Sequence, residues 1–306
     1  VGYVFVVQAV NIHTQFDIIE RALVKKCNRS VNGRGMIREQ REDRSAVRQW
    51  ENNARNARIG GQGMNPFKTP KQHLVHKVFT SIVERYELLN TILSLGQDKY
   101  WRRAVSKIAA LKPEQMAIDI CTGTGSLAIE LVKHIDMDSK NAHLSVVGMD
   151  FCNEMLSKAK GKLDNPRYKG RIEFVNGLAE DIPFPDNTFD CATIAFGLRN
   201  VDSIRQTFSQ MQRVVKHGGK IISLELVVPS SKFIQCFYYP YLKWILPNIG
   251  RLVSKKGIPY QYLSDSISGF MSAEDLANIM TLSGLKDVIW HNLSGGVAAI
   301  HVGYSA

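Results

Sequence analysis

Apolar and polar positions along the chain form blocks that predict strands and helices in alternation. Short runs rich in apolar residues have the length of buried strands, and they occur at 116–121, 143–150, 171–177, 189–197, 218–227, 287–294 and 297–305. Segments with apolar residues at helical spacing lie between them, at 126–135, 153–163, 203–215 and 272–284. Strands separated by helices form a parallel sheet covered on both faces, whereas closing strands joined by a short link form an antiparallel hairpin. The pattern therefore predicts an α/β fold with a doubly wound, mostly parallel seven-stranded sheet and an antiparallel C-terminal edge hairpin.

The sequence before this sheet divides into two parts. Residues 1–63 are rich in Arg, Asn and Gln and contain few periodic apolar positions, so we expect a poorly ordered N-terminal extension. Residues 64–306 then form one domain, with further helices expected at 73–93 and 98–111, the second capped by Asp98. For the extension, a basic arm for anionic lipid and sequence upstream of the natural start are both open interpretations.

The formal net charge of the chain is +11. Residues 1–63 hold eleven Lys and Arg against six Asp and Glu, so +5 of this charge lies there and +6 in the rest. A basic chain can bind nucleic acid, but acids are interspersed and no run of four or more positive residues occurs. We therefore expect a solvated basic surface, or weak attraction to anionic lipid, and no nucleic-acid partner.

The five cysteines are scattered, with no CxxC pair and no His at ligand spacing. This distribution is typical of a reducing compartment and argues against structural zinc, so we expect no metal. No stretch approaches the roughly 20 apolar residues that span a bilayer. The apolar start of the chain lacks the basic leader and the cleavage site of a signal peptide.

A glycine turn follows the first predicted strand. Gly123, Gly125 and Ala128 fit the G-x-G-x-x-G/A pattern of nucleotide-binding turns, and Asp150 ends the next strand, where a carboxylate can bind ribose hydroxyls. Asp119 precedes the turn by four residues, where a dinucleotide would place its diphosphate. Like charges about 4 Å apart repel by roughly 4 kcal/mol at an effective dielectric constant near 20. The ammonium and sulfonium of S-adenosylmethionine would instead be attracted, so the turn favours this cofactor.

A second class of enzyme remains as an alternative. Tyr239 and Lys243 have the Tyr-x-x-x-Lys spacing of NAD(P)-dependent short-chain dehydrogenases, which need a helix to bring both side chains to one face. Pro240 follows the tyrosine directly, and the pair comes after the fifth predicted strand rather than the fourth. Both features argue against a dehydrogenase.

Several long motifs resemble one enzyme family. The run PFPDNTFDCATIAFGLRNV at 183–201 resembles the C-methyltransferases of ubiquinone and menaquinone biosynthesis (the UbiE/MenG type), which are class I S-adenosylmethionine-dependent enzymes with a Rossmann-like fold. YELLNTILSLGQDKYW at 86–101, RVVKHGGKIISLELV at 213–227 and GGVAAIHVGY at 295–304 agree with the same family and occur in the same order. The resemblance covers roughly residues 66–306.

The resemblance implies specific contacts to S-adenosylmethionine. They are Thr124 in the turn, Asp150 on the ribose, Leu178 and Ala179 beside the adenine, and Ala195 at the end of the fourth strand. We add Asp119, Gly123 and Gly125 from the turn itself.

Three positions depart from the family pattern. Asp98 stands where relatives have His, Ser126 where an acidic residue often follows the glycine turn, and His217 where relatives have Pro.

The implied substrate is a polyprenylated hydroquinone that is methylated on a ring carbon. Demethylmenaquinol is the first expectation, and 2-methoxy-6-polyprenyl-1,4-benzoquinol of ubiquinone biosynthesis is the alternative. Arg199 and Asn200 follow the fourth strand, at the edge where open α/β sheets hold their sites, and we expect them to stabilise a phenolate and orient the ring. His301 is the candidate base, and Tyr86 and Asn90, one helical turn apart, are candidates to close the substrate side.

The segment 232–250 carries six aromatic residues within 233–244. It predicts a lid over the sheet, an apolar passage for a prenyl tail, or an interfacial membrane contact. The resemblance implies a cytoplasmic enzyme, with peripheral contact at the inner face of the membrane and a homo-oligomer both left open.

Overall fold

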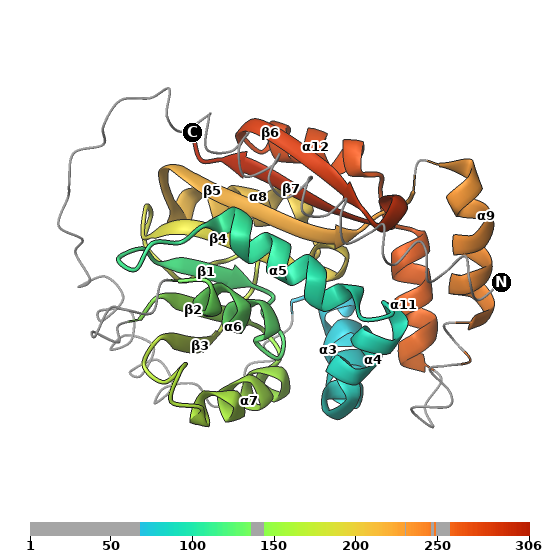
Figure 1. Ribbon diagram of the computed structural model, residues 1–306, viewed down its shortest axis with the longest axis horizontal. Helices are drawn as coiled ribbons and strands as arrows, with labels where there is room; N and C mark the ends of the chain where they lie inside the picture. Colours follow the sequence, from blue (N-terminus) through green and yellow to red (C-terminus); the bar gives the residue numbers. More distant parts are fainter. Residues whose placement is uncertain (1–67, 136–143, 230, 246–247, 249–257) are drawn as a thin grey trace.

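The central sheet has seven strands in the order β3-β2-β1-β4-β5-β7-β6. A computed structural model describes residues 68–135, 144–229, 231–245, 248 and 258–306 (Figure 1). The strands are β1 Ala117–Ile120, β2 Val146–Asp150, β3 Ile172–Asn176, β4 Phe189–Ala195, β5 Val215–Leu226, β6 Lys286–Leu293 and β7 Ala298–Tyr304. Neighbouring strands are parallel except where β7 pairs with β5 and β6.

The predicted doubly wound sheet with its C-terminal hairpin is confirmed. Within the hairpin, β7 lies between β5 and β6, so β6 forms the edge of the sheet. Every residue of β7 is buried, whereas β6 is largely exposed or half-buried. The continuous apolar run AAIHV suits the inner strand, and the more polar sequence of β6 suits an edge.

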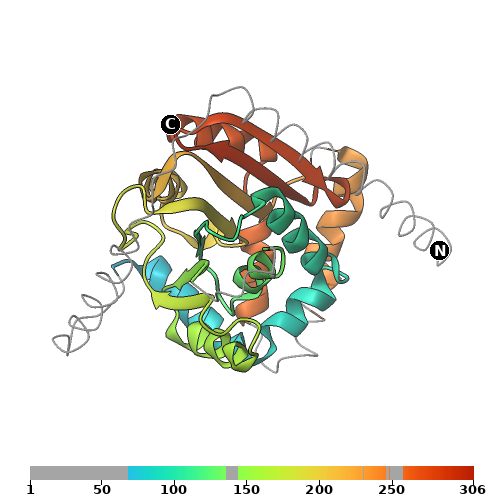
Figure 2. The same cartoon turned by 60° about the vertical axis from the view of Figure 1, so that its left-hand side comes forward.

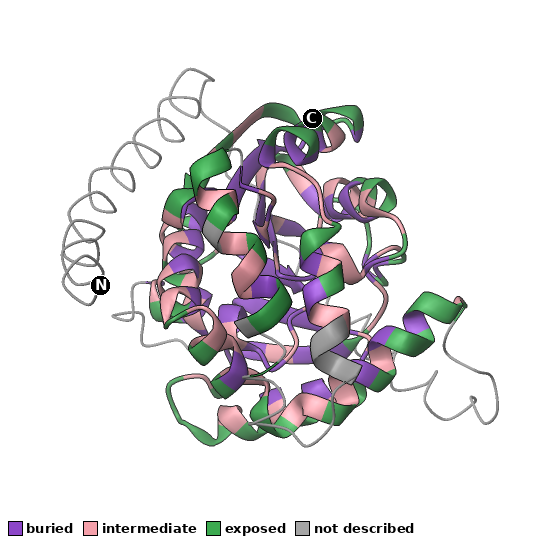
Figure 3. Ribbon diagram, turned by 90° about the vertical axis from the view of Figure 1, so that its right-hand side faces the viewer, coloured by how far each residue is buried: buried purple, intermediate pink, exposed green. Residues whose placement is uncertain are grey.

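Helices cover both faces of the sheet (Figures 1 and 2). One apolar cluster joins the sheet to helices on the first face and a second joins it to helices on the other. The first face carries α5 Gln97–Ala109, α6 Ser126–Lys133 and α7 Asn153–Gly161, and the second carries α8 Ile204–Val214 and α12 Ala273–Leu282. Buried residues line the strands and the inner sides of these helices, while exposed residues lie outside (Figure 3).

A third group of helices lies at the carboxyl end of the parallel strands, at the right of Figure 1. Its members are α3 Pro70–Ile82, α4 Tyr86–Leu93, α9 Lys232–Pro240, the π-helical turn η4 Tyr241–Ile245 and α11 Ile258–Ser268. The Tyr241 hydroxyl donates a hydrogen bond to the Leu93 carbonyl at 2.7 Å, which ties η4 to α4. The aromatic-rich segment therefore packs beside the N-terminal helices and closes one end of the sheet.

The helical structure expected at 73–93 is present, but a 3₁₀ turn, η1 Val83–Arg85, divides it into α3 and α4. The ammonium group of Lys158 on α7 donates to the carbonyls of Val83 at 3.0 Å and Glu84 at 2.7 Å. A side chain from another element thus satisfies carbonyls at the break.

The cap predicted for the next helix is wrong. The N-cap of α5 is Gly96 in a left-handed conformation, and Asp98 lies inside the first turn. There the Asp98 carboxylate contacts Arg102 one turn along the same helix, with Nη1 to Oδ2 at 2.5 Å.

Among the described residues, no helix has the length and apolar content needed to cross a bilayer. The expected extension, residues 1–63, lies outside the described part of the chain.

Candidate functional site

The turn between β1 and α6 brings backbone N–H groups to the carboxyl end of the sheet. Gly123 and Gly125 have φ angles of 56° and 75°, in the left-handed region that glycine adopts without steric cost. A Cβ atom on Gly125 would lie 2.5 Å from Cζ of Phe174. The tight turn therefore requires the glycines that the sequence motif predicted.

Asp150 lies at the end of β2, against this turn. Its carboxylate accepts hydrogen bonds from the backbone N–H groups of Gly123 at 2.8 Å and Cys152 at 2.9 Å. Burial raises the pKa of Asp150 to about 6, although these backbone hydrogen bonds favour the ionised form. The position suits a ligand whose hydroxyl groups donate hydrogen bonds to the carboxylate, such as a ribose.

Asp119 is a second buried carboxylate, on β1. It accepts hydrogen bonds from the hydroxyls of Thr122 at 2.6 Å and Thr193 at 2.7 Å. Burial raises the pKa of Asp119 to about 6 as well, and the two threonines oppose the shift. A buried carboxylate here repels a diphosphate and attracts a cation, so the site fits S-adenosylmethionine better than a dinucleotide.

Tyr86, the first residue of α4, lies over the glycine turn. Its Cε1 atom is 3.8 Å from an ideal Cβ on Gly123, and its ring contacts Phe79 edge to face at 5.8 Å between centroids. A cavity of ≈ 40 Å³ that Tyr86 shares with Asp150 and a cavity of ≈ 20 Å³ that it shares with Asp119 flank the turn. Ligand pockets usually measure about 300–1,000 Å³, so each of these two spaces is smaller than a pocket that encloses a whole ligand.

Glu87, on α4, contacts the glycine turn and the start of α6. Its Oε1 atom accepts hydrogen bonds from the hydroxyls of Thr124 at 2.6 Å and Ser126 at 2.8 Å, and it also contacts the ammonium of Lys162. Burial opposes ionisation, but the hydrogen bonds outweigh it and lower the pKa of Glu87 to about 2. Glu87 thus brings a carboxylate to Ser126.

Arg199 and Asn200 follow β4 in the turn η3 Leu198–Asn200. The Arg199 side chain is 6% exposed, and its Nη1 atom lies 2.6 Å from Oε1 of Glu225, which is fully buried. Burial opposes the charge of Arg199, but the Glu225 carboxylate raises the pKa of the guanidinium above its usual value. The amide oxygen of Asn200 accepts a hydrogen bond from the Tyr262 hydroxyl at 2.9 Å.

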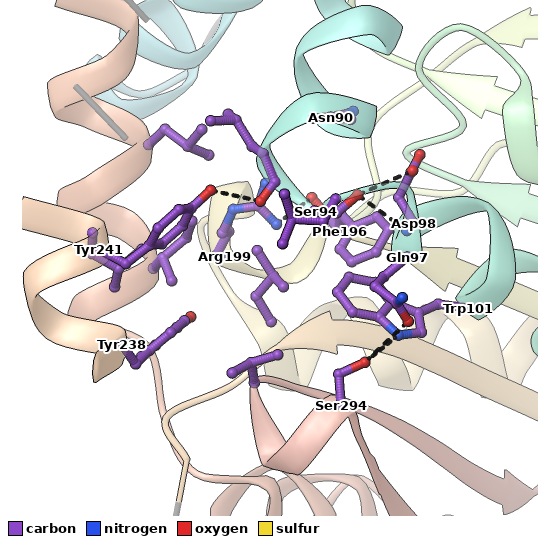
Figure 4. A pocket seen from close by; sticks show the side chains of 17 residues that line it. Asn90, Ser94, Gln97, Asp98, Trp101, Phe196, Arg199, Tyr238, Tyr241 and Ser294 are labelled. Carbon is purple, nitrogen blue, oxygen red and sulfur yellow. Dashed lines mark hydrogen bonds between the residues drawn. The ribbon is translucent and has the colours of Figure 1, made fainter. Parts of the chain in front are cut away.

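A larger cavity of ≈ 290 Å³ lies between the glycine turn and the aromatic-rich helices (Figure 4). Its walls are mostly apolar, and Arg199 and Asp98 are the charged residues in its described lining. Phe196 lines both this cavity and the one beside Asp150. The two spaces therefore adjoin at the end of β4, as a cofactor site and an acceptor pocket must.

The structure brings most of the predicted site residues together. Tyr86, Asn90, Arg199 and Asn200 line a small shared cavity, and Ala195 and Thr124 line the cavity beside Asp119. Their assigned roles remain predictions.

Leu178, Ala179 and His301 line none of these cavities. His301 is fully buried in β7, where its Nε2 atom lies 2.8 Å from the Ala273 carbonyl oxygen. Burial lowers the pKa of His301 to about 4. The structure therefore does not place His301 where it could take a proton from an acceptor.

Sequence reasoning missed Glu225, Glu87 and Arg102 as members of the site. Glu225 and Glu87 lie inside the quoted motifs, and a search for acids able to pair with Arg199 and with the turn hydroxyls would have singled them out. The motifs alone do not show which acid meets which partner, because Glu225 is 26 residues from Arg199 and Glu87 is 39 residues from Ser126.

The sheet order, the glycine turn and the two buried carboxylates define a class I S-adenosylmethionine-dependent methyltransferase. Two solved structures share the fold: a methyltransferase of Thermotoga maritima, described as a possible histamine N-methyltransferase, and one of Aquifex aeolicus. The first has a TM-score of 0.52 at 19% identity and covers 75% of this chain and 99% of its own. The second has a TM-score of 0.51 at 18% identity, and the match covers 72% of this chain and 98% of the other chain.

The chain belongs to the ubiE/COQ5 methyltransferase family, whose family model matches residues 67–305. The "Ubiquinone/menaquinone biosynthesis C-methyltransferase UbiE" of Geobacter sp. (strain M21) is 40% identical over 233 residues, which are 76% of this chain and 97% of the relative. The "Demethylmenaquinone methyltransferase" of Desulfitobacterium hafniense (strain Y51) is 37% identical over 230 residues, which are 75% of this chain and 89% of the relative.

The dehydrogenase alternative is wrong. The family and the fold exclude it, and Tyr239 and Lys243 lie on α9 and η4, where neither lines the cofactor cavities.

We expect the affinity for S-adenosylmethionine to fall at least about tenfold between about pH 7.5 and pH 5, because one pH unit below a pKa of about 6 leaves a tenth of a carboxylate ionised. Titration calorimetry at a series of pH values measures this. The folded-state pKa values lie above the unfolded ones, so the free protein should lose stability as pH rises from about 4 to about 6. Asp119→Asn should flatten the binding profile in part, because Asp150 still titrates with a pKa of about 6. An affinity of the native protein that does not change with pH would contradict the assignment.

Proposed function

We propose that this enzyme transfers a methyl group to a ring carbon of a polyprenylated hydroquinone, with demethylmenaquinol as the first choice of acceptor. The observation that carries the proposal is the apolar cavity of ≈ 290 Å³ beside the cofactor turn, with the buried guanidinium of Arg199 in its wall. Relatives named demethylmenaquinone methyltransferase support the choice. Methylation of 2-methoxy-6-polyprenyl-1,4-benzoquinol is the alternative, since other relatives carry the ubiquinone/menaquinone name.

Polar atoms without partners support an acceptor that carries hydroxyl groups. Within the described residues, Nε of Arg199, Oε2 of Glu225 and the hydroxyl of Tyr238 are buried and make no hydrogen bond. Arg199 and Tyr238 both line the cavity. Buried polar groups are nearly always satisfied, so the unpaired atoms of Arg199 and Tyr238 fit a ligand that exchanges hydrogen bonds with them.

Arg199 has a clear task in this chemistry. An aromatic carbon is a weak nucleophile until a neighbouring hydroxyl loses its proton, and a buried cation lowers the pKa of such a hydroxyl so that the bound acceptor is held as the phenolate, with its proton released to bulk solvent. After the ring carbon has taken the methyl group, the hydrogen on that carbon leaves as a proton and the ring regains its aromaticity. S-adenosylmethionine supplies the methyl group as an electrophile on a positively charged sulfur. The apolar walls exclude water, which favours a reaction in which opposite charges disappear. We propose that Asn200, whose amide oxygen accepts a hydrogen bond from Tyr262, orients the ring.

The surface beside the pocket supports access for a prenyl tail. Leu95, in the turn after α4, is 76% exposed, and Phe233 on α9 and Trp244 on η4 are 74% and 63% exposed, in the segments that flank the cavity. Exposed large apolar residues in such a position suit contact with a bilayer. We therefore propose a cytoplasmic enzyme that contacts the membrane peripherally through these segments.

A methyl-transfer assay that compares a short-chain naphthoquinol with a benzoquinol of equal tail length tests the function. We expect turnover with the naphthoquinol to exceed that with the benzoquinol by at least about tenfold in kcat/KM, a difference of about 1.4 kcal/mol. A reversed ratio would establish the ubiquinone alternative. Failure of both quinols, with S-adenosylmethionine binding intact, would exclude this substrate class.

A further inference from the structure

We propose that Arg102 binds the carboxylate of the cofactor's methionyl group and that Asp98 is a positioning residue that holds Arg102 in place. This inference rests on the cofactor and not on the proposed quinol acceptor. Neither residue belongs to the glycine turn, and Arg102 lies outside the described lining of the acceptor cavity, which Asp98 shares.

Each of the two small cavities fits one end of the cofactor. Asp150, at the end of β2, suits the ribose and therefore places the adenosine end in its own cavity. The methionyl end then lies on the other side of the Tyr86 ring, in the cavity beside Asp119. That end is a zwitterion, and it needs an acceptor for its ammonium and a donor for its carboxylate.

The cavity beside Asp119 supplies both charges. Asp119 provides the carboxylate, and Arg102 is the one cation among the described residues that line this cavity. The Arg102 charge also opposes the rise that burial causes in the pKa of Asp119, which places the two groups within electrostatic reach. A cavity with one carboxylate and one guanidinium matches an amino-acid zwitterion.

The guanidinium is held from one side and open on the other. Its Nη1 atom donates to Oδ2 of Asp98 at 2.5 Å, and its Cζ atom lies 5.3 Å from the centroid of the Phe196 ring, within cation–π range. The Phe196 ring in turn contacts Trp101 at 6.1 Å between centroids. Within the described part of the chain, Nε and Nη2 of Arg102 donate no hydrogen bond, so they remain for a bidentate carboxylate.

Asp98 links this contact to the acceptor pocket. It is 5% exposed, its Oδ1 atom accepts a hydrogen bond from the Ser94 hydroxyl at 3.1 Å, and it lines the ≈ 290 Å³ cavity. A carboxylate at this position can orient Arg102 through an ion pair. The rival explanation is a helix ion pair, i to i+4, that only stabilises α5.

Titration calorimetry with two ligands separates these explanations. S-adenosylhomocysteine has the amino-acid end, whereas 5′-methylthioadenosine has the same adenosine and thioether without it. We expect Arg102→Gln to raise the Kd for S-adenosylhomocysteine by about 10- to 100-fold, as for a lost charge-assisted hydrogen bond. The Kd for 5′-methylthioadenosine should stay within about twofold of the native value.

Three variants of the full chain complete the test. Asp98→Asn should raise the Kd for S-adenosylhomocysteine by a smaller factor and leave that for 5′-methylthioadenosine unchanged. Arg102→Lys should recover part of the affinity, because it keeps the charge but not the bidentate geometry. Asp150→Asn, the matched control, should weaken both ligands, since both carry the ribose.

Equal weakening of both ligands by Arg102→Gln, or of neither, would overturn the proposal. If Arg102→Gln does not fold, Arg102→Lys and Asp98→Asn decide by the same ratio of the two Kd values. An unaltered ratio in these variants would leave only the helix ion pair. A changed ratio in an enzyme that methylates no quinol would uphold Arg102 and exclude only the proposed acceptor.

Discussion

Replacement of Arg199 with methionine is expected to lower methyl transfer by at least about tenfold, a loss of about 1.4 kcal/mol or more of transition-state stabilisation. The Arg199 guanidinium lies in the wall of the acceptor pocket and is 6% exposed, so no solvent cation can replace it there. The affinity for S-adenosylmethionine should stay nearly unchanged, because Arg199 lines neither small cavity beside the glycine turn. Single-turnover methyl transfer and titration calorimetry measure the two quantities.

The ion pair with Glu225 makes a control necessary. Removal of Arg199 alone leaves a fully buried carboxylate without its partner, which costs about 3–5 kcal/mol of stability. The double variant Arg199→Met with Glu225→Gln removes both charges and should recover most of the melting temperature while methyl transfer stays low. If the double variant regained native turnover, Arg199 would serve the fold and not the reaction.

Replacement of Asp150 with alanine should weaken S-adenosylmethionine binding by about 1–3 kcal/mol, the usual range for a lost hydrogen bond to a charged group. This corresponds to about a 5- to 150-fold rise in Kd. The carboxylate is well placed for the effect, since the backbone N–H groups of Gly123 and Cys152 fix both of its oxygens. Titration calorimetry on a variant with a native melting profile gives the measurement.

Asp150→Asn is the matched control for this experiment. It keeps an acceptor oxygen for one backbone N–H group and should lose less affinity than Asp150→Ala. Native affinity in a folded Asp150→Ala protein would remove Asp150 from the cofactor site and leave the glycine turn without its ribose contact.

For the N-terminal helices, the sequence predicted helical structure but not where each helix begins and ends. Apolar spacing correctly indicated helical structure in 73–93, but not the break at Val83–Arg85, because the carbonyls at the break are satisfied by Lys158 from α7. Asp98 resembled an N-cap in the sequence, yet Gly96 begins the helix. Local preferences are weak, and a partner distant in the sequence can override them.

In the site, too, some residues could be predicted from the sequence and others could not. The glycine pattern, Asp119 and Asp150 were recognisable because strand ends and the turn between them have local sequence signals. Arg199 was recognisable from its motif, but Glu225 was not assigned to it, because their contact depends on the packing of β4 beside β5. His301 looked suitable by residue type, and only its burial against Ala273 excludes it from the cavities.

The sequence by itself determined the order of strands and helices along the chain, the doubly wound sheet and the glycine turn. These features follow from short apolar runs, from the helical period of 3.6 residues and from glycine conformations, which act over a few neighbouring positions. Only the tertiary structure decided that Tyr86 covers the turn, that Glu87 faces Ser126 and that Arg102 enters the cavity beside Asp119. Such contacts join helices and strands that are far apart along the chain, and their geometry is set by how those elements pack.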